Sequence, residues 1–308
     1  MRRTIMAVLA TASVVALAAC GGSDPLDVDP DSASSDAGDQ VAAQDIVVGS
    51  ANFPGNVLLA QIYAAALEAD GVDVSTTLNI GSRETYLPAL ADGSIDVIPE
   101  YTGALLTYLN PDATLGSSEQ ILDALPDAVA EGTQILEPAL AQDKDSITVT
   151  ADTADKYSLT SIADLAPVAG ELVLGAAPEF ETRPNGIPGL ESVYGVGFGE
   201  FRPFDAAGNL TVQSLINGQI DAANIYTSDP AIAANDFVVL EDPENLFPAQ
   251  QIVPLIATAA ASETVTDSLN EVSAALTQEA LQELMARVLT DGEDPGDVAQ
   301  DWVSQTLG

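Results

Sequence analysis

Short hydrophobic runs and longer amphipathic stretches alternate along most of the chain. Residues 46–50 form an apolar run that ends near a glycine, as a buried strand does, and residues 72–78 alternate between polar and apolar side chains. Between these two predicted strands, apolar residues at helical spacing begin at Pro54 and predict a helix. A second helix over residues 82–91 and a third strand from Asp96 follow.

The order strand, helix, strand, helix, strand with short connections is typical of an α/β fold. It predicts a largely parallel sheet that binds ligands at the carboxyl ends of its strands. The second half repeats this alternation, with predicted strands over 171–175 and 220–226 and predicted helices over 188–194, 210–217, 262–276, 277–289 and from Asp294 onward. About 264 residues follow the N-terminal segment, which is more than one core usually covers, so two lobes are expected.

One sequence element occurs twice without a gap. Residues 90–96 read Leu-Ala-Asp-Gly-Ser-Ile-Asp and are followed, after four residues, by Tyr101-Thr102. Residues 215–221 read Leu-Ile-Asn-Gly-Gln-Ile-Asp and are followed, after four residues, by Tyr226-Thr227. Each copy predicts a helix that ends at glycine, a strand that begins at Ile-Asp, and a Tyr-Thr pair at the carboxyl end of that strand.

The repeat predicts one Tyr-Thr pair on each side of a ligand crevice. If the two lobes face each other, Tyr101 and Tyr226 lie at the strand ends where open α/β sheets bind ligands. Their ring faces are suited to a cation, above all to a quaternary ammonium, which cannot donate a hydrogen bond. The spacing alone allows another interpretation, in which both tyrosines are core residues with satisfied hydroxyls.

The first residues have the pattern of an export signal. Two arginines precede an apolar run over residues 5–17 and small residues before Cys20, with no acid in the stretch. This run is shorter than the roughly 20 residues of a membrane span. It resembles a bacterial lipobox, which predicts cleavage of residues 1–19 and acylation of Cys20. The alternative is an ordinary signal peptide with a chance cysteine.

Residues 20–44 predict a lipidated tether. After Cys20, the only cysteine of the chain, the sequence consists mainly of Gly, Ser, Asp, Pro and Ala, too few large apolar residues to offset the entropy of ordering them. The protein is therefore expected outside the cytoplasm, anchored to the cell membrane by lipid on Cys20.

The charge balance is strongly acidic. The full chain has 8 Lys and Arg against 47 Asp and Glu, and removal of residues 1–19, which hold two arginines and no acid, leaves a formal charge of −41. Such a surface repels nucleic acid and anionic lipid. The chain has no histidine, and no nucleophile-elbow or phosphate-loop motif, so an enzyme is not expected; a carboxylate pair such as Glu100 and Asp229 is the remaining catalytic possibility. No cofactor and no metal are expected.

From Ile46 nearly to Gly308 the chain resembles the substrate-binding proteins of osmoprotectant ABC importers, the glycine betaine, choline and carnitine binders. The Pro-Glu-Tyr-Thr-Gly block that contains Tyr101 and the Tyr-Thr-Ser-Asp block at Tyr226 are the more specific matches. The matching stretches are Val48–Phe53, Gly81–Glu84, Asp96–Gly103, Phe180–Gly186, Tyr194–Val196 and Tyr226–Asp229.

The resemblance implies a two-lobed periplasmic-binding-protein (type II) fold with a ligand cleft between the lobes. Residues 45–145 and 251–308 are expected to form the first lobe and residues 146–250 the second. The implied function is delivery of a quaternary-ammonium osmoprotectant to the membrane subunits of an ABC permease, by a protein that is a monomer.

The resemblance also implies a site. In this family four tyrosines commonly surround the trimethylammonium group, and Tyr101 and Tyr226 match two of them. An ungapped comparison places Ile147 and Gln250 at the other two positions, and the Gln250 amide is able to bond a hydroxyl or carboxylate. Thr102 and Thr227 are expected at the ligand with their tyrosines.

Three further candidates lie near the predicted cleft. Arg183 matches a basic residue near the ligand carboxylate, which a guanidinium binds with two hydrogen bonds; a surface ion pair with Glu179 or Glu181 is the alternative. Asn52 and Asn56 come directly after the first predicted strand, where they either face the ligand or act as turn and cap residues.

Two other functions stay open at the level of sequence. A structural or adhesive lipoprotein would have no pocket and would not be stabilised by small solutes. A binding protein for an amino acid or another carboxylate would depend on Arg183 more than on the tyrosines.

Overall fold

The structure, a computed structural model, describes residues 45–111, 113 and 117–308. The predictions for the signal peptide, Cys20 and the tether fall on residues 1–44 and lie outside the described residues. Within the described part of the chain, no helix is both long and apolar enough to cross a membrane.

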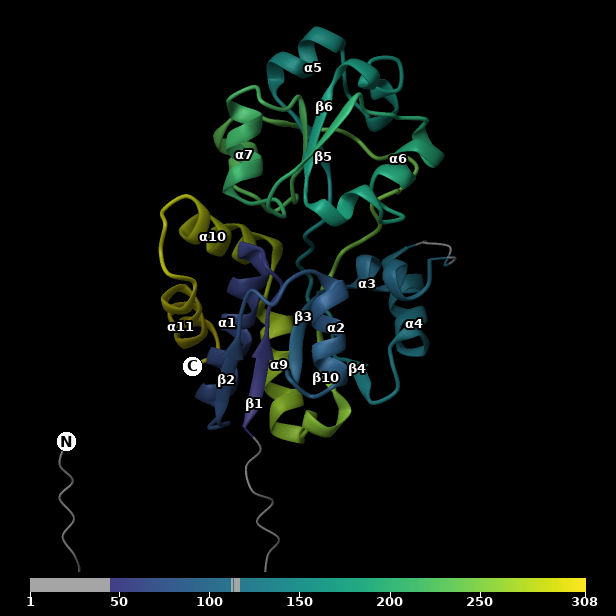
Figure 1. Ribbon diagram of the computed structural model, residues 1–308. Helices are drawn as coiled ribbons and strands as arrows, with labels where there is room; N and C mark the ends of the chain where they lie inside the picture. Colours follow the sequence, from purple (N-terminus) through teal and green to yellow (C-terminus); the bar gives the residue numbers. More distant parts are fainter. Residues whose placement is uncertain (1–44, 112, 114–116) are drawn as a thin grey trace, which may run out of the picture. The chain divides into compact units, whose positions relative to one another are not determined.

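Two five-stranded sheets organise the described residues (Figure 1). The order across the first sheet is β2 (Val74–Thr77), β1 (Ile46–Gly49), β3 (Val97–Tyr101), β10 (Ile252–Ala257) and β4 (Thr133–Ile135). The order across the second is β7 (Glu200–Pro203), β6 (Val173–Ala176), β8 (Ala222–Asn224), β5 (Ile147–Val149) and β9 (Val238–Val239).

Both sheets are largely parallel, as predicted, but each contains one strand that runs against the other four. In the first sheet β1 runs parallel to β2 and β3, whereas β10 runs antiparallel to β3 and β4. In the second sheet β6 runs parallel to β7 and β8, whereas β5 runs antiparallel to β8 and β9. The antiparallel strands β5 and β10 are those that the chain enters directly after it crosses between the sheets.

Helices cover both faces of the first sheet because its strands alternate. Ile46 and Val48 of β1 pack on one side, together with α1 (Pro54–Ala69), while Val47 contacts the cluster on the other side. The first side also holds α9 (Glu263–Ala275), α10 (Gln278–Leu289) and α11 (Pro295–Thr306), and the second holds α2 (Arg83–Ala91), α3 (Thr102–Leu109) and α4 (Ser118–Ala128).

The second sheet has two cores as well. Ala222 belongs to the cluster that contains α6 (Ile187–Tyr194), whereas its neighbour Ala223 packs with α7 (Asn209–Ile216). The remaining helices are α5 (Ala151–Tyr157) and the short α8 (Ala231–Ala234), with 3-10 turns at Ile162–Leu165, Ala169–Glu171, Pro178–Glu181 and Thr258–Ala260.

The sequence repeat is also a structural repeat. Gly93 after α2 and Gly218 after α7 have positive φ angles of 78° and 66°, a conformation that glycine adopts without steric cost. The aspartates that follow these glycines make equivalent hydrogen bonds in the two sheets. The Asp96 carboxylate accepts from the Val47 backbone N–H at 2.9 Å, and the Asp221 carboxylate accepts from the Val173 backbone N–H at 2.9 Å.

The boundaries of the repeated strands differ from the prediction. β3 ends at Tyr101, as expected for a residue at the carboxyl end of a strand. The second copy was expected to be a strand over residues 220–226, but β8 is shorter and ends at Asn224, so Tyr226 lies two residues beyond it.

Candidate ligand-binding site

A cavity lies where segments from both sheets meet, and it encloses about 570 Å³ of empty space, part of it open to solvent. Its lining consists of four aromatic rings, five charged side chains and small or polar residues: Ala51, Asn52, Phe53, Ser82, Arg83, Tyr86, Tyr101, Ala104, Asp143, Asp145, Glu179, Arg183, Asn185, Ala206, Tyr226 and Gln250.

Three of these rings form a continuous group. The ring centroid of Phe53 lies 5.9 Å from that of Tyr101 and 5.1 Å from that of Tyr226, and both pairs are tilted. Tilted rings at this spacing attract one another weakly and present π faces to the space beside them. The structure therefore brings the two tyrosines of the repeat together at one cavity, with Phe53 between them.

Sequence reasoning missed Phe53 as a site residue. It precedes α1 in extended conformation, in the loop that follows the carboxyl end of β1. The rule that ligands bind at carboxyl strand ends therefore applies to it too. The repeat did not reveal it because Phe53 lies outside the repeated element.

Tyr101 is buried, with a relative exposure of 7%, and its hydroxyl has no hydrogen-bond partner among the described residues. Burial and then the nearby Asp143 carboxylate raise the pKa of this phenol well above its usual value, so it stays protonated. An uncharged buried hydroxyl without a partner carries a desolvation cost that a ligand in the cavity would offset.

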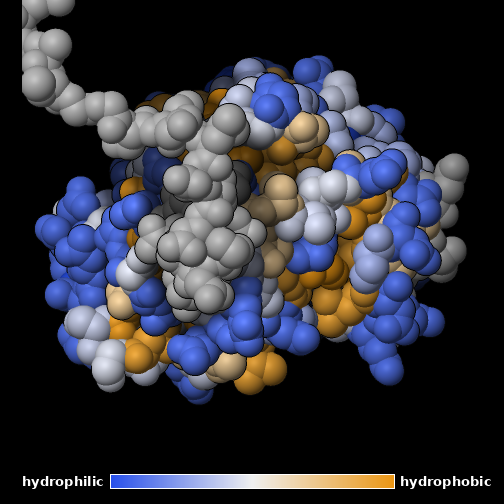
Figure 2. Space-filling model, turned by 90° about the horizontal axis from the view of Figure 1, so that it is seen from below, coloured by the Kyte–Doolittle hydropathy of each residue, from blue (hydrophilic) through white to orange (hydrophobic). Residues whose placement is uncertain are grey.

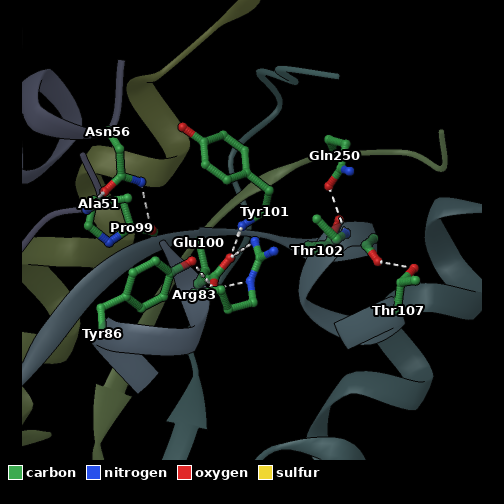
Figure 3. A network of polar contacts seen from close by, with 12 residues as sticks. Ala51, Asn56, Arg83, Tyr86, Pro99, Glu100, Tyr101, Thr102, Thr107 and Gln250 are labelled. Atoms are coloured by element: carbon green, nitrogen blue, oxygen red, sulfur yellow. Dashed lines mark hydrogen bonds and ion pairs between the residues drawn. The ribbon is translucent and has the colours of Figure 1, made fainter. Parts of the chain in front are cut away.

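Glu100, the residue before Tyr101, points to the other side of β3 and is held in place by hydrogen bonds. It is fully buried and binds the Arg83 guanidinium through two hydrogen bonds of 2.8 Å, while the Tyr86 hydroxyl donates a third at 2.6 Å. Figure 3 shows these side chains converging on Glu100 while the ring of Tyr101 points away from them. With its oxygens so occupied, Glu100 is not placed to act as a catalytic base.

Arg83 and Tyr86, both in α2, were also not named as site residues from sequence. Burial alone would lower the pKa of Arg83, but the paired Glu100 raises it, and the net effect is a pKa well above the usual value. Arg83 therefore carries its positive charge at any working pH. The signal in the sequence was their spacing: Arg83 and Tyr86 are three residues apart, so they lie on the same face of a helix.

Arg183 lines the cavity but already has carboxylate partners. Its guanidinium lies 3.2 Å from Glu84 of α2 and 3.8 Å from Glu179, so the ion pair with Glu179 is present, whereas Glu181 is not a partner within the described residues. Partial burial would raise the pKa of Glu84, yet hydrogen bonds from Ser82, its own backbone and Arg183 lower it to about 2. A ligand carboxylate would have to compete with both acids for Arg183.

The two threonines of the repeat face away from the cavity and hold the segments that connect the sheets. The Thr102 hydroxyl donates to the Ala249 carbonyl at 3.3 Å and accepts from the Gln251 N–H at 3.2 Å. The Thr227 hydroxyl accepts from the Lys144 N–H at 3.0 Å. Neither threonine is among the residues that line the cavity, and direct contact of either with the ligand stays a prediction.

The two asparagines have different places. Asn52 lines the cavity. Asn56 is buried, accepts from the Ala51 N–H at 2.7 Å and donates to the Pro99 carbonyl at 2.8 Å (Figure 3). Both ends of the Asn56 amide are thus used to tie the loop after β1 to β3, and Asn56 is a structural residue.

Gln250 and Ile147, which stand at the other two tyrosine positions of the family, differ in their location. Gln250 lines the cavity, and its side-chain carbonyl accepts from the Ala104 N–H at 2.9 Å at the start of α3. Ile147 does not line the cavity: it is fully buried in the core of the second sheet, because the alternation of β5 turns it to the same side as Val149. The prediction of Ile147 at the ligand is corrected accordingly.

Two carboxylates that sequence reasoning did not select also line the cavity. Asp143 and Asp145 lie on the segment between β4 and β5. Burial raises the pKa of Asp143 to about 7 and also raises the pKa of Asp145. The described residues contain no cluster of His, Cys, Asp and Glu that could hold a metal ion.

Comparison with known proteins assigns the chain to a family. Residues 44–305 match the model of the substrate-binding domain of ABC-type glycine betaine transport systems. The chain belongs to this family. The prediction made from the sequence motifs is confirmed, and so is the α/β fold of periplasmic binding proteins. Members of this glycine betaine transport family are binding components of transport systems and not enzymes.

Several relatives support the assignment. The glycine betaine-binding protein YehZ of Escherichia coli is 29% identical over 278 residues, which cover 86% of this chain and 91% of YehZ. A carnitine transport binding protein of Listeria monocytogenes is 24% identical, with 84% and 86% covered. The crystal structure of a glycine betaine/carnitine/choline ABC transporter protein has the same fold, with a TM-score of 0.67 at 22% identity, covering 85% of this chain and 98% of that one.

Family membership gives the cavity its context. Substrate-binding proteins of ABC importers act outside the cytoplasm and pass small solutes to a permease. The cavity is lined by Phe53, Tyr101 and Tyr226 and lies beside the carboxyl ends of β1, β3 and β8.

Proposed function

We propose that this protein is an extracytoplasmic binding protein that delivers a quaternary-ammonium osmoprotectant, of the glycine betaine, choline or carnitine type, to an ABC permease. The group of three rings carries the proposal. A quaternary ammonium within about 6 Å of a ring centroid gains up to about 2 kcal/mol per ring when desolvated. Phe53 lies 5.1 and 5.9 Å from Tyr226 and Tyr101, so one cation is able to contact all three.

Delivery of the ligand to the permease is supported by the fact that the aromatic rings come from both sheets. Tyr101 ends a strand of the first sheet, and Tyr226 follows a strand of the second. A ligand that contacts both favours the conformation in which both lobes, residues 45–145 with 251–308 and residues 146–250, surround it, and that conformation presents a composite surface to the permease. The working form is a monomer held at the membrane by lipid on Cys20.

An amino acid or another carboxylate is the second candidate ligand. The observation that favours it is the presence of Arg183 in the cavity lining. Its two acidic neighbours, Glu84 and Glu179, weigh against it because they already neutralise the guanidinium.

Calorimetry of the mature protein tests the choice of ligand, with glycine betaine, proline betaine, choline, carnitine and ectoine in the panel. At least one quaternary ammonium is expected to bind, and Tyr101→Ala and Tyr226→Ala are each expected to weaken that binding about tenfold or more. Failure of every quaternary ammonium to bind, or near-normal affinity in both variants, would contradict the proposal. Binding of an amino acid that is lost in Arg183→Ala would support the second candidate.

A further inference from the structure

We infer that Asp143 and Asp145 are the counter-ions of the bound cation and that they make this cavity select ligands of net positive charge over zwitterions. The inference rests on the proposed function and makes it narrower. It begins with geometry, because both carboxylates line the same cavity as Phe53, Tyr101 and Tyr226.

The structure holds both carboxylates firmly. Asp143 accepts a hydrogen bond from the Ser228 N–H at 3.0 Å, and its own N–H donates to the Gln250 carbonyl at 3.1 Å. Asp145 accepts from the Asn224 side-chain amide at 3.1 Å. In each case one carboxylate oxygen makes the bond, and the other has no hydrogen-bond partner within the described residues. A fixed carboxylate with a free oxygen is preorganised for a cation.

The charges around the cavity leave these two acids unmatched. Arg83 is neutralised by Glu100, and Arg183 lies beside Glu84 and Glu179. Among the described residues, no lysine or arginine nitrogen lies within 4.0 Å of Asp143 or Asp145, although Lys144 stands between them in the sequence. The lining therefore has a surplus of negative charge in the same cavity as the aromatic rings. Both arginines of the lining already have carboxylate partners, so neither is free to bind a ligand carboxylate.

The groups around Asp143 determine its protonation in the absence of a ligand. Burial raises its pKa and the nearby carboxylates of Asp145 and Asp229 also raise it, while hydrogen bonding by the Ser228 backbone lowers it, with a net value of about 7. Tyr101 and Tyr226, the other titratable groups that face it, stay neutral because their own pKa values are raised. From α1, only the uncharged start of the helix at Gly55 approaches the second carboxylate oxygen.

Some groups around Asp145 raise the pKa of its carboxylate and others lower it. Burial raises its pKa, while the Asn224 amide, Arg183, Arg83 and Lys144 lower it in that order. Around Asp145 the positive charges of Arg183, Arg83 and Lys144 thus oppose the effect of burial, although its pKa is still raised. A cation that enters the cavity replaces the proton on Asp143 and adds to the attraction of Asp145, so its binding releases a proton near neutral pH.

The experiment compares three ligands in the full mature protein by calorimetry: tetramethylammonium, choline and glycine betaine. The first two carry a net positive charge, and the third carries the same trimethylammonium group together with a carboxylate. We expect choline to bind about tenfold more tightly than glycine betaine, and choline affinity to rise about tenfold from pH 6 to pH 8 as Asp143 loses its proton.

Variants locate the effect. Asp143→Asn keeps the acceptor for Ser228 and is expected to weaken choline about tenfold or more while glycine betaine changes by less than about threefold. Asp145→Asn is expected to act in the same direction. Glu181→Gln removes one exposed negative charge outside the lining and serves as the control, with affinities unchanged.

The outcomes separate the two proposals. If neither these three ligands nor proline betaine and carnitine bind, the proposed function fails and this inference with it; if only the latter two bind, the inference alone is overturned. If the three ligands bind but glycine betaine equals or exceeds choline, or if Asp143→Asn weakens both equally, only the inference is overturned. Should Asp143→Asn fail to fold, the selectivity and pH dependence of the unaltered protein still decide the question.

Discussion

At the scale of single residues, the cavity combines three rings with fixed charges of both signs. The repeated motif made Tyr101 and Tyr226 predictable, because equal spacing in two copies indicates equal positions in two sheets. Phe53 and Asp143 were not predictable in the same way. Phe53 has no counterpart in the repeat, and Asp143 is one of 47 acidic residues, so only the fold distinguishes it from the solvated ones.

Phe53→Ala tests the central ring. Because Phe53 contacts both tyrosine rings, its removal is expected to weaken quaternary-ammonium binding about tenfold or more, while Phe53→Tyr keeps most of the affinity. Calorimetry with choline and glycine betaine measures the effect. Phe198→Ala, a partly buried ring packed against the core of the second sheet, is the control and should leave the affinity unchanged. An unchanged affinity in Phe53→Ala would remove this ring from the site.

The buried pair of Arg83 and Glu100 makes a prediction about stability. Glu100→Gln leaves the Arg83 guanidinium without a counter-charge in a site where it is 7% exposed, which should lower the free energy of unfolding by about 3 kcal/mol. Urea unfolding measures the change. Glu200→Gln, at the exposed pair with Arg202, should leave the free energy of unfolding nearly unchanged. Equal costs in the two variants would contradict the account of the buried pair.

At the scale of elements, each repeat consists of a helix, a glycine, a strand and a Tyr-Thr pair. The aspartates of the two copies bond the neighbouring strands in the same way, and the tyrosines reach one cavity. Spacing could predict that much. It could not predict that Thr102 and Thr227 turn to the connecting segments, because those segments are near only after the chain has folded back.

Thr227→Val is the variant that tests the role of the second threonine. Valine has the same shape but leaves the Lys144 N–H without its side-chain acceptor, so the free energy of unfolding should fall by about 1 kcal/mol. Because Thr227 does not line the cavity, the expected change in ligand affinity is small compared with that of Tyr226→Ala. Denaturant unfolding and calorimetry measure the two effects. Thr264→Val, at an exposed position of α9, is the matched control. A loss of affinity as large as that of Tyr226→Ala would place Thr227 at the ligand.

At the scale of the whole molecule, the sequence predicted the α/β class and the family but not the direction of every strand. The two strands that run against their neighbours, β5 and β10, were not predicted as strands, and periodicity contains no information on whether a strand runs with or against its neighbour. The acidic surface was predictable from composition. Figure 2 shows one face on which hydrophilic residues cover much of the surface and hydrophobic residues gather between them.

The central claim is that one cation is held by the rings of Phe53, Tyr101 and Tyr226. The most direct test is the position of the quaternary nitrogen in a crystal structure of the mature protein with choline. The account predicts a nitrogen within about 6 Å of all three ring centroids. A nitrogen that lies outside this group of rings, or a choline molecule bound elsewhere on the protein, would contradict it.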